Sequence, residues 1–129
     1  LKSLDEAQKF GFNTVVVTLN RNAEQIIDEC AKRGLYVVVR TPIDTTSLGD
    51  NIRRGGNPSN DPLWNESYLW CNLHALNTTK GNSAIIGYAI AKGKTSGLNI
   101  YDSYVMMKSL APNYLVIYEG AKGEWATDK

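Results

Sequence analysis

The sequence predicts an α/β fold built from four parallel β/α units. Four apolar runs alternate with four helical patterns along the chain, and two of these runs, at residues 15–17 and 37–39, consist of consecutive valines. Continuous β-branched runs are typical of strands covered on both faces, as in parallel sheets. Regular alternation of helix and strand indicates right-handed crossovers between the strands.

The first half of the chain supplies two helices and two strands. Strands are expected at residues 14–19 and 36–40. A helix over residues 1–10 ends before Gly11, and a second helix begins at a stretch that resembles a capping box, at Asn22, and ends before Gly34.

The second half repeats the pattern, with strands expected at residues 84–90 and 114–118. The pair Asp61-Pro62 places a cap before a first-turn proline, so a helix over 63–76 follows, and Pro112 ends the next helix. The apolar stripes of these two helices are Leu69, Leu73 and Leu76 on the first, and Ile100, Tyr104, Met107 and Leu110 on the second.

Composition excludes several classes of protein. The 129 residues suit a single domain over 1–129, and 14 Lys and Arg against 13 Asp and Glu give a net charge of +1. This balance argues against nucleic acid and membrane as partners. No signal peptide is visible, so we expect a soluble chain and leave its compartment open.

Metal and cofactor sites are not expected from the sequence. The two cysteines, Cys30 and Cys71, fall in separate helices and are predicted to be buried thiols, and a single histidine, His74, excludes a Cys/His zinc site. The long segment 41–60 follows the second strand, at the edge where α/β proteins bind ligands.

Several motifs resemble those of glycoside hydrolase family 2, the β-galactosidase-like TIM barrels. The stretches are GFNTV at 11–15, CAKRGLYVV at 30–38, DPLW at 61–64, NIY at 99–101, MKS at 107–109 and VIYEG at 116–120. The resemblance implies half of a (β/α)₈ barrel, carrying the family's strands two to five. The half with the nucleophilic glutamate would then be absent.

At the positions of the family's acid/base glutamate and metal-binding histidine, this chain carries other residues. Read without gaps, the resemblance places the acid/base glutamate at Gly93, and with a one-residue shift at Lys92. The family's metal-binding stretch falls on residues 40–47, where Asp44 keeps a carboxylate and Thr46 replaces a histidine. We therefore predict no catalytic residue and no metal site.

The resemblance implies a carbohydrate as the ligand. We expect it to contact residues at or near the C-terminal edge of the strands, namely Arg40, Asp44, Tyr88, Asn99 and Glu119. The function expected is that of a catalytically inert, glycoside-hydrolase-like domain with residual carbohydrate binding. The alternatives are an active glycosidase with non-standard carboxylates, drawn from Asp44, Glu119 and Glu124, or a purely structural fragment of a larger hydrolase.

Four parallel strands cannot close a barrel, so the assembly also needs an explanation. Exposed strand edges invite pairing with another chain, and we expect a homodimer in which two halves form eight strands. The alternatives are an open, flavodoxin-like sheet with helices on both faces, and a fragment whose partner segment lies elsewhere.

Overall fold

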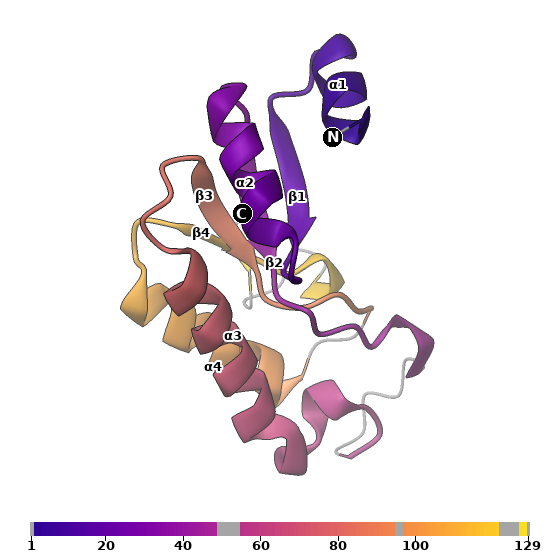
Figure 1. Ribbon diagram of the computed structural model, residues 1–129. Coiled ribbons are helices and arrows are strands. Elements are labelled where there is room, and N and C mark those ends of the chain that lie inside the picture. Colours follow the sequence, from indigo (N-terminus) through magenta and orange to yellow (C-terminus); the bar gives the residue numbers. More distant parts are fainter. Residues whose placement is uncertain (1, 49–54, 95–96, 122–126, 129) are drawn as a thin grey trace.

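The computed structural model describes residues 2–48, 55–94, 97–121 and 127–128 (Figure 1). Helices and strands alternate along the chain, and each strand lies within its predicted range. The elements are α1 (Lys2–Lys9), β1 (Thr14–Thr18), α2 (Ala23–Lys32), β2 (Tyr36–Arg40), α3 (Asn65–Thr79), β3 (Ile85–Ala89), α4 (Leu98–Leu110) and β4 (Leu115–Ile117), with short 3-10 turns at Thr46–Leu48, Pro58–Asn60, Pro62–Trp64 and Glu119–Ala121.

The four strands form one parallel sheet in the order β1-β2-β3-β4. Val15 pairs with Val37, and Tyr88 lies between Val39 and Val116 in the register. The register of β2 against β3 shifts between Val37 and Val38. The predicted α/β fold with four parallel β/α units is therefore confirmed.

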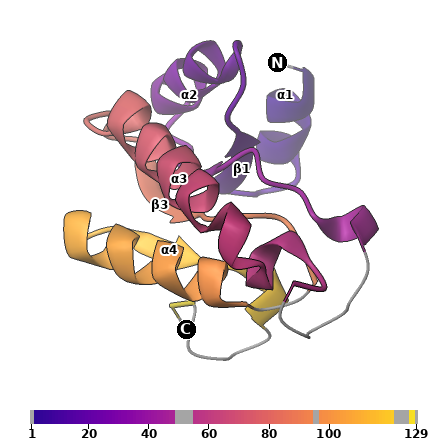
Figure 2. The same ribbon diagram turned by 90° about the horizontal axis from the view of Figure 1, so that it is seen from below.

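The helices α2, α3 and α4 cover one face of this sheet (Figure 2). Alternate strand residues such as Val37, Val39 and Val116 are fully buried in the core. Their neighbours Val16, Tyr36 and Leu115 are 47%, 50% and 47% exposed, and we call the side they occupy the open face. The alternative with helices on both faces is wrong for the described elements.

The buried side of α3 differs from the predicted leucine stripe. Tyr68, Asn72, Ala75 and Leu76 are buried, whereas Leu69 and Leu73 are only half-buried. Asn72 is polar, but it can lie in the middle of this buried side because its hydrogen bonds are satisfied. The Asn72 amide donates to the Tyr68 carbonyl (3.0 Å), and its oxygen accepts from the Thr41 hydroxyl (2.7 Å).

The stripe predicted for α4 is half right. Ile100 and Met107 are fully buried, Tyr104 is half-buried and Leu110 is exposed. None of the described helices is long and apolar enough to cross a membrane.

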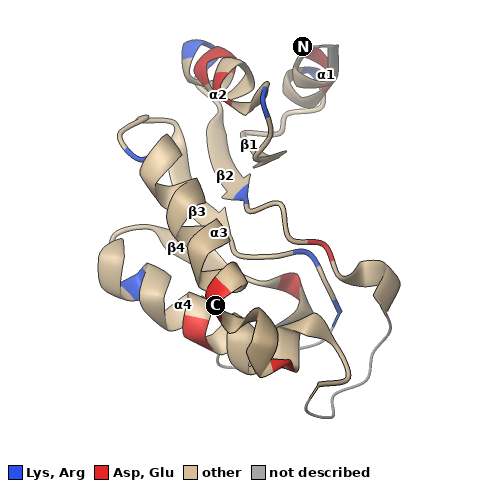
Figure 3. Cartoon of the chain, turned by 60° about the horizontal axis from the view of Figure 1, so that its bottom comes forward, with Lys and Arg blue, Asp and Glu red and all other residues tan. Residues whose placement is uncertain are grey.

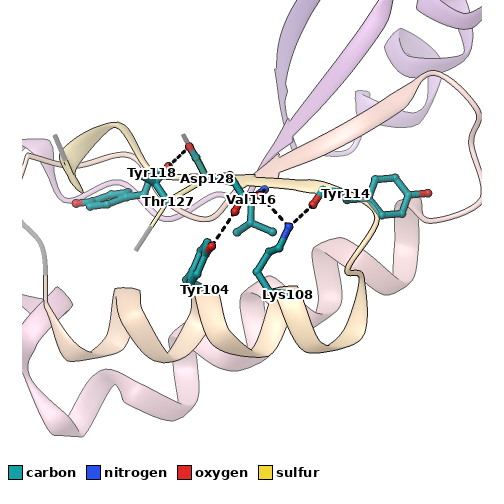
Figure 4. A network of polar contacts seen from close by, with 7 residues as sticks. All are labelled: Tyr104, Lys108, Tyr114, Val116, Tyr118, Thr127 and Asp128. Atoms are coloured by element: carbon teal, nitrogen blue, oxygen red, sulfur yellow. Dashed lines mark hydrogen bonds and ion pairs between the residues drawn. The ribbon is translucent and has the colours of Figure 1, made fainter. Parts of the chain in front are cut away.

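The outer edge of β4 is covered by Asp128 (Figure 4). The Asp128 N–H donates to the Val116 carbonyl (2.8 Å), and its Oδ2 accepts from the Val116 N–H (2.9 Å). The carboxylate also accepts from Lys108 (2.9 Å) and from the Tyr104 hydroxyl (2.7 Å). Burial alone would raise the pKa of Asp128, but these hydrogen bonds outweigh it and lower the pKa below the ordinary value.

Replacing Asp128 by alanine should lower the free energy of unfolding by about 1–3 kcal/mol, because three donors lose their charged acceptor. The depressed pKa makes this contribution complete above the unfolded carboxyl pKa, and it is lost as the pH falls through the folded value. Urea unfolding of the chain and of Asp128→Ala should thus converge in strong acid. Glu66→Ala, at an exposed acid on α3, is the control, and a stability gap unchanged from neutral to strongly acid pH would contradict the assignment.

Candidate functional site

Charged side chains gather where the strands end. We call this region the carboxyl edge and define it by Arg40 at the end of β2, Asp44 in the next segment, Lys92 after β3 and Glu119 after β4. Figure 3 shows basic and acidic residues together on the segments that follow β2 and β3. Because the strands are parallel, all their C-terminal ends lie at the same edge of the sheet, and these residues lie together there.

Backbone pairing continues past β2 and β3 and fixes two of these residues. The Lys92 N–H donates to the Ile43 carbonyl (2.7 Å), and the Thr45 N–H donates to the Lys92 carbonyl (2.9 Å). Asp44 and Lys92 thereby form an isolated parallel bridge. Their side chains are consequently held on neighbouring segments of the carboxyl edge.

An ion pair spans the carboxyl edge across the end of β3. Arg40 Nη2 lies 3.7 Å from Glu119 Oε1. The Glu119 side chain is 77% exposed and the Arg40 side chain 22% exposed, so water screens the pair and it contributes little to stability. Both groups remain accessible to a ligand.

The Asp44 carboxylate is held in its ionised form. It accepts hydrogen bonds from the Thr46 hydroxyl (2.6 Å) and the Thr46 N–H (3.0 Å). These bonds lower its pKa, and the positive charges of Lys92 and Arg40 lower it further. A general acid requires a raised pKa, so Asp44 suits the accepting of hydrogen bonds and not proton donation.

Gly93 has no room for a side chain. A Cβ atom built there would lie 2.6 Å from Thr45 Oγ1 and 2.8 Å from the Tyr118 hydroxyl. A Cβ on Gly120 would meet the Tyr118 ring at 2.5 Å, so this buried ring lies between the two glycines. The sequence did not predict that Thr45 and Tyr118 pack at this position. The only signal for this packing was the presence of Gly93 and Gly120.

Tyr88 lies on the helix side of the sheet. It pairs in register with Val39 and is fully buried, and its hydroxyl is 2.9 Å from Thr79 Oγ1 at the end of α3. Burial raises its pKa. The structure thus gives Tyr88 a packing position away from the carboxyl edge, and its expected ligand contact stays a prediction.

Asn99 is buried at the start of α4. Its amide donates to the carbonyls of Pro58 and Asp61 (2.7 Å each), and its oxygen accepts from the Asn65 amide (3.0 Å). These bonds join the turn before α3 to α4. The role of Asn99 in this structure is to hold the two helices in place, so a ligand contact there also stays a prediction.

No group of three His, Cys, Asp or Glu side chains that could hold a metal ion occurs among the described residues. Glu124, named above as a candidate carboxylate, lies outside the described residues. Cys30 is buried and Cys71 half-buried, and both are free thiols. Burial raises the pKa of the Cys30 thiol, as expected for a packing residue.

Comparison with known proteins assigns a family to this arrangement. The family model "Glycosyl hydrolases family 2, TIM barrel domain" matches residues 2–129. No curated protein matches.

Solved structures share the fold at low sequence identity. β-Glucuronidase 3 of Bacteroides uniformis superposes with a TM-score of 0.65 at 11% identity, covering 91% of this chain and 15% of that chain. For a Bifidobacterium dentium β-glucuronidase complexed with coumarin-3-O-glucuronide, the TM-score is 0.64, the identity 17% and the coverage 91% and 19%. A β-galactosidase from Rahnella superposes with a TM-score of 0.55 at 12% identity, covering 82% of this chain and 21% of that chain. The chain therefore spans less than a quarter of the length of these proteins.

The packing around Gly93 predicts the effect of a single methyl group. Gly93→Ala should lower the free energy of unfolding by about 1–3 kcal/mol, because Thr45 and Tyr118 must move to admit the Cβ. Urea unfolding measures the change, and Lys94→Ala, at the exposed next position, is the control. A Gly93→Ala variant as stable as the parent chain would show that this space is not filled.

Proposed function

This chain belongs to glycosyl hydrolase family 2, as part of the TIM-barrel domain of that family, and from this premise we propose that the unit is catalytically inert and binds carbohydrate at its carboxyl edge. The observation that carries the proposal is the packing at Gly93. The resemblance places the acid/base carboxyl at this position, where Thr45 and Tyr118 fill the space of a side chain.

The chemistry of retaining glycoside hydrolysis supports inertness. The reaction needs two carboxyl groups about 5–5.5 Å apart, one of them protonated when the leaving group departs. Of the two carboxylates at the carboxyl edge, Asp44 has a lowered pKa and Glu119 faces the Arg40 guanidinium. The lowered pKa of Asp44 disfavours a proton on that carboxyl group.

The same groups suit recognition of a sugar. Arg40 and Lys92 offer donors to ring hydroxyls or to a carboxylate, and Asp44 and Glu119 offer acceptors. The solved structures of similar fold are β-glucuronidases and a β-galactosidase, which supports a glycoside as the ligand class. We therefore propose weak binding of a glucuronide or galactoside.

A second candidate is an active glycosidase that uses Asp44 and Glu119. It is favoured by one observation, namely that Arg40 pairs with Glu119 and that the charge of Arg40 also contributes to the lowered pKa of Asp44. Turnover separates this candidate from the inert unit.

With nitrophenyl β-glucuronide and β-galactoside, we expect no release of nitrophenol above the buffer rate, since Gly93 stands at the acid/base position and Asp44 has a lowered pKa. The assay compares the chain with Glu119→Gln and with Glu66→Gln, which changes an acid on α3. Turnover that disappears in Glu119→Gln and persists in Glu66→Gln would establish the second candidate.

Binding is measured separately, by NMR titration with the methyl glycosides. Arg40→Ala should weaken binding roughly tenfold, equivalent to about 1.4 kcal/mol, because it removes the donor at the centre of the carboxyl edge. If neither glycoside shifts the amide signals of residues at this edge, the binding half of the proposal fails.

We also propose a homodimer, formed through the open face. Val16, Tyr36 and Leu115 expose apolar surface there, and such patches mark interfaces. Pairing of β1 with the partner's β4 would compete with Asp128, which already bonds both backbone groups of Val116. A closed eight-stranded barrel would therefore require these two hydrogen bonds to be exchanged.

Light scattering over a range of concentrations should give a mass twice that of the chain. Tyr36→Lys places a charge on the open face and should return the monomer, whereas Val105→Lys, at an exposed site on α4, should not. A parent chain that stays monomeric at every concentration would contradict the homodimer.

A further inference from the structure

The outer edge of β1 presents backbone hydrogen-bonding groups to solvent. On the inner side, the Leu19 N–H donates to the Arg40 carbonyl (2.9 Å), so the odd-numbered residues direct their backbone groups towards β2. Successive residues of a strand alternate, and the N–H and C=O groups of Thr14, Val16 and Thr18 therefore point away from the sheet. Within the described part of the chain, no strand pairs with β1 on this side.

The opposite edge of the sheet is already closed (Figure 4). The residues of β4 that direct their backbone outwards are Val116 and, just beyond the strand, Tyr118. Their N–H groups donate to Asp128 Oδ2 (2.9 Å) and Thr127 Oγ1 (3.0 Å), and the Asp128 N–H donates to the Val116 carbonyl (2.8 Å). Residues 127 and 128 thus take the place of a further strand, so the sheet can be extended at β1 without breaking a bond but not at β4.

The sequence of β1 does not protect its edge. Residues 14–18 read TVVVT, without the charged residues or proline that commonly keep edge strands from pairing. A hollow of about 490 Å³ is lined by residues 15–18 and by Ser3 and Leu4 of α1, so α1 leaves room beside the strand. Another strand can therefore reach this edge.

The edge of β1 is complementary to itself. Because TVVVT reads the same in both directions, an antiparallel copy related by a two-fold axis at Val16 places Thr14 opposite the partner's Thr18. Val16 then lies opposite its own copy. Each of these outward positions carries a donor and an acceptor, so opposed residues can exchange both hydrogen bonds, as in an antiparallel ladder. The cross-strand neighbours are Thr with Thr and Val with Val, which are favourable pairs.

We propose that two copies of this chain join along β1, antiparallel, so that two four-stranded sheets become one continuous sheet. The proposal rests on the homodimer proposed above and names the strand along which its two copies meet. Val16 contributes twice, because its backbone lies at the edge and its side chain lies on the open face beside the partner's Val16. Asp128 keeps β4 closed at both outer edges, and the assembly therefore stops at two copies.

Charges at the two ends of β1 test this register. In Thr14→Lys/Thr18→Lys, like charges face each other across the β1–β1 interface, whereas in Thr14→Lys/Thr18→Glu opposite charges do. Analytical ultracentrifugation at low salt should give a dimer dissociation constant at least about tenfold higher for the first variant than for the second. Both threonines are exposed, so both variants should keep the circular dichroism spectrum of the parent chain.

Amide hydrogen exchange gives an independent readout on the parent chain. Exchange of the Val16 N–H should slow as the concentration rises, whereas exchange of the Val116 N–H, already bonded to Asp128, should not depend on concentration. A parent chain that dimerises while the two variants dissociate alike, or while Val16 exchange stays constant, would overturn the β1–β1 interface and leave the homodimer standing. A parent chain that stays monomeric at every concentration would overturn both.

Discussion

Parallel strands can be joined only by crossovers, and this constraint determines most of the molecule. Each crossover has the same hand, so α2, α3 and α4 all pack on one face of the sheet. The buried face carries fully buried residues such as Val37, Val39 and Val116, and the opposite face retains exposed Val16, Tyr36 and Leu115. The same parallel order collects all four C-terminal strand ends at one edge. A covered face, an open face and a polar edge thus have a single cause.

In the C-terminal half of the chain, three glycines allow neighbouring segments to pack closely against the backbone. At Gly87, a Cβ atom would lie 2.7 Å from the Leu115 carbonyl oxygen, so β3 and β4 pair closely only because that position has no side chain. Gly93 and Gly120 flank the Tyr118 ring in the same way. The ring is buried and occupies the space that a side chain at either glycine would need. The close packing of Tyr118 against Gly93 therefore requires that position 93 carries no side chain, and hence no acid.

The sequence was sufficient for the fold but only partly for the site. Consecutive valines in β1 and β2 and the Asp61 cap, whose carboxylate accepts from the Leu63 N–H, were readable because they are local signals. The capping-box interpretation at Asn22 was wrong, since its side chain makes no cap hydrogen bond and Asn20 accepts from the Asn22 N–H instead. The packing position of Tyr88 was not readable, because a continuous apolar strand does not reveal which of its residues face the helices. Which residues of β3 face the helices depends on the shift in register of β2 against β3 between Val37 and Val38. Only the pairing of the strands in three dimensions sets this register.

Polar residues in this chain have two distinct uses, and burial separates them. Asn72 and Asn99 are fully buried and have their hydrogen bonds met within the protein, so they specify how α3 and α4 meet the preceding loops. Arg40 and Glu119 sit at the sheet edge, and Arg21, Glu24 and Lys80 border a groove on the helix side, where water and solutes reach them. A sequence motif does not distinguish the two uses, because Asn99 belongs to a family-like motif and serves packing. Accessibility, more than residue type, therefore decides where this scaffold can meet a ligand.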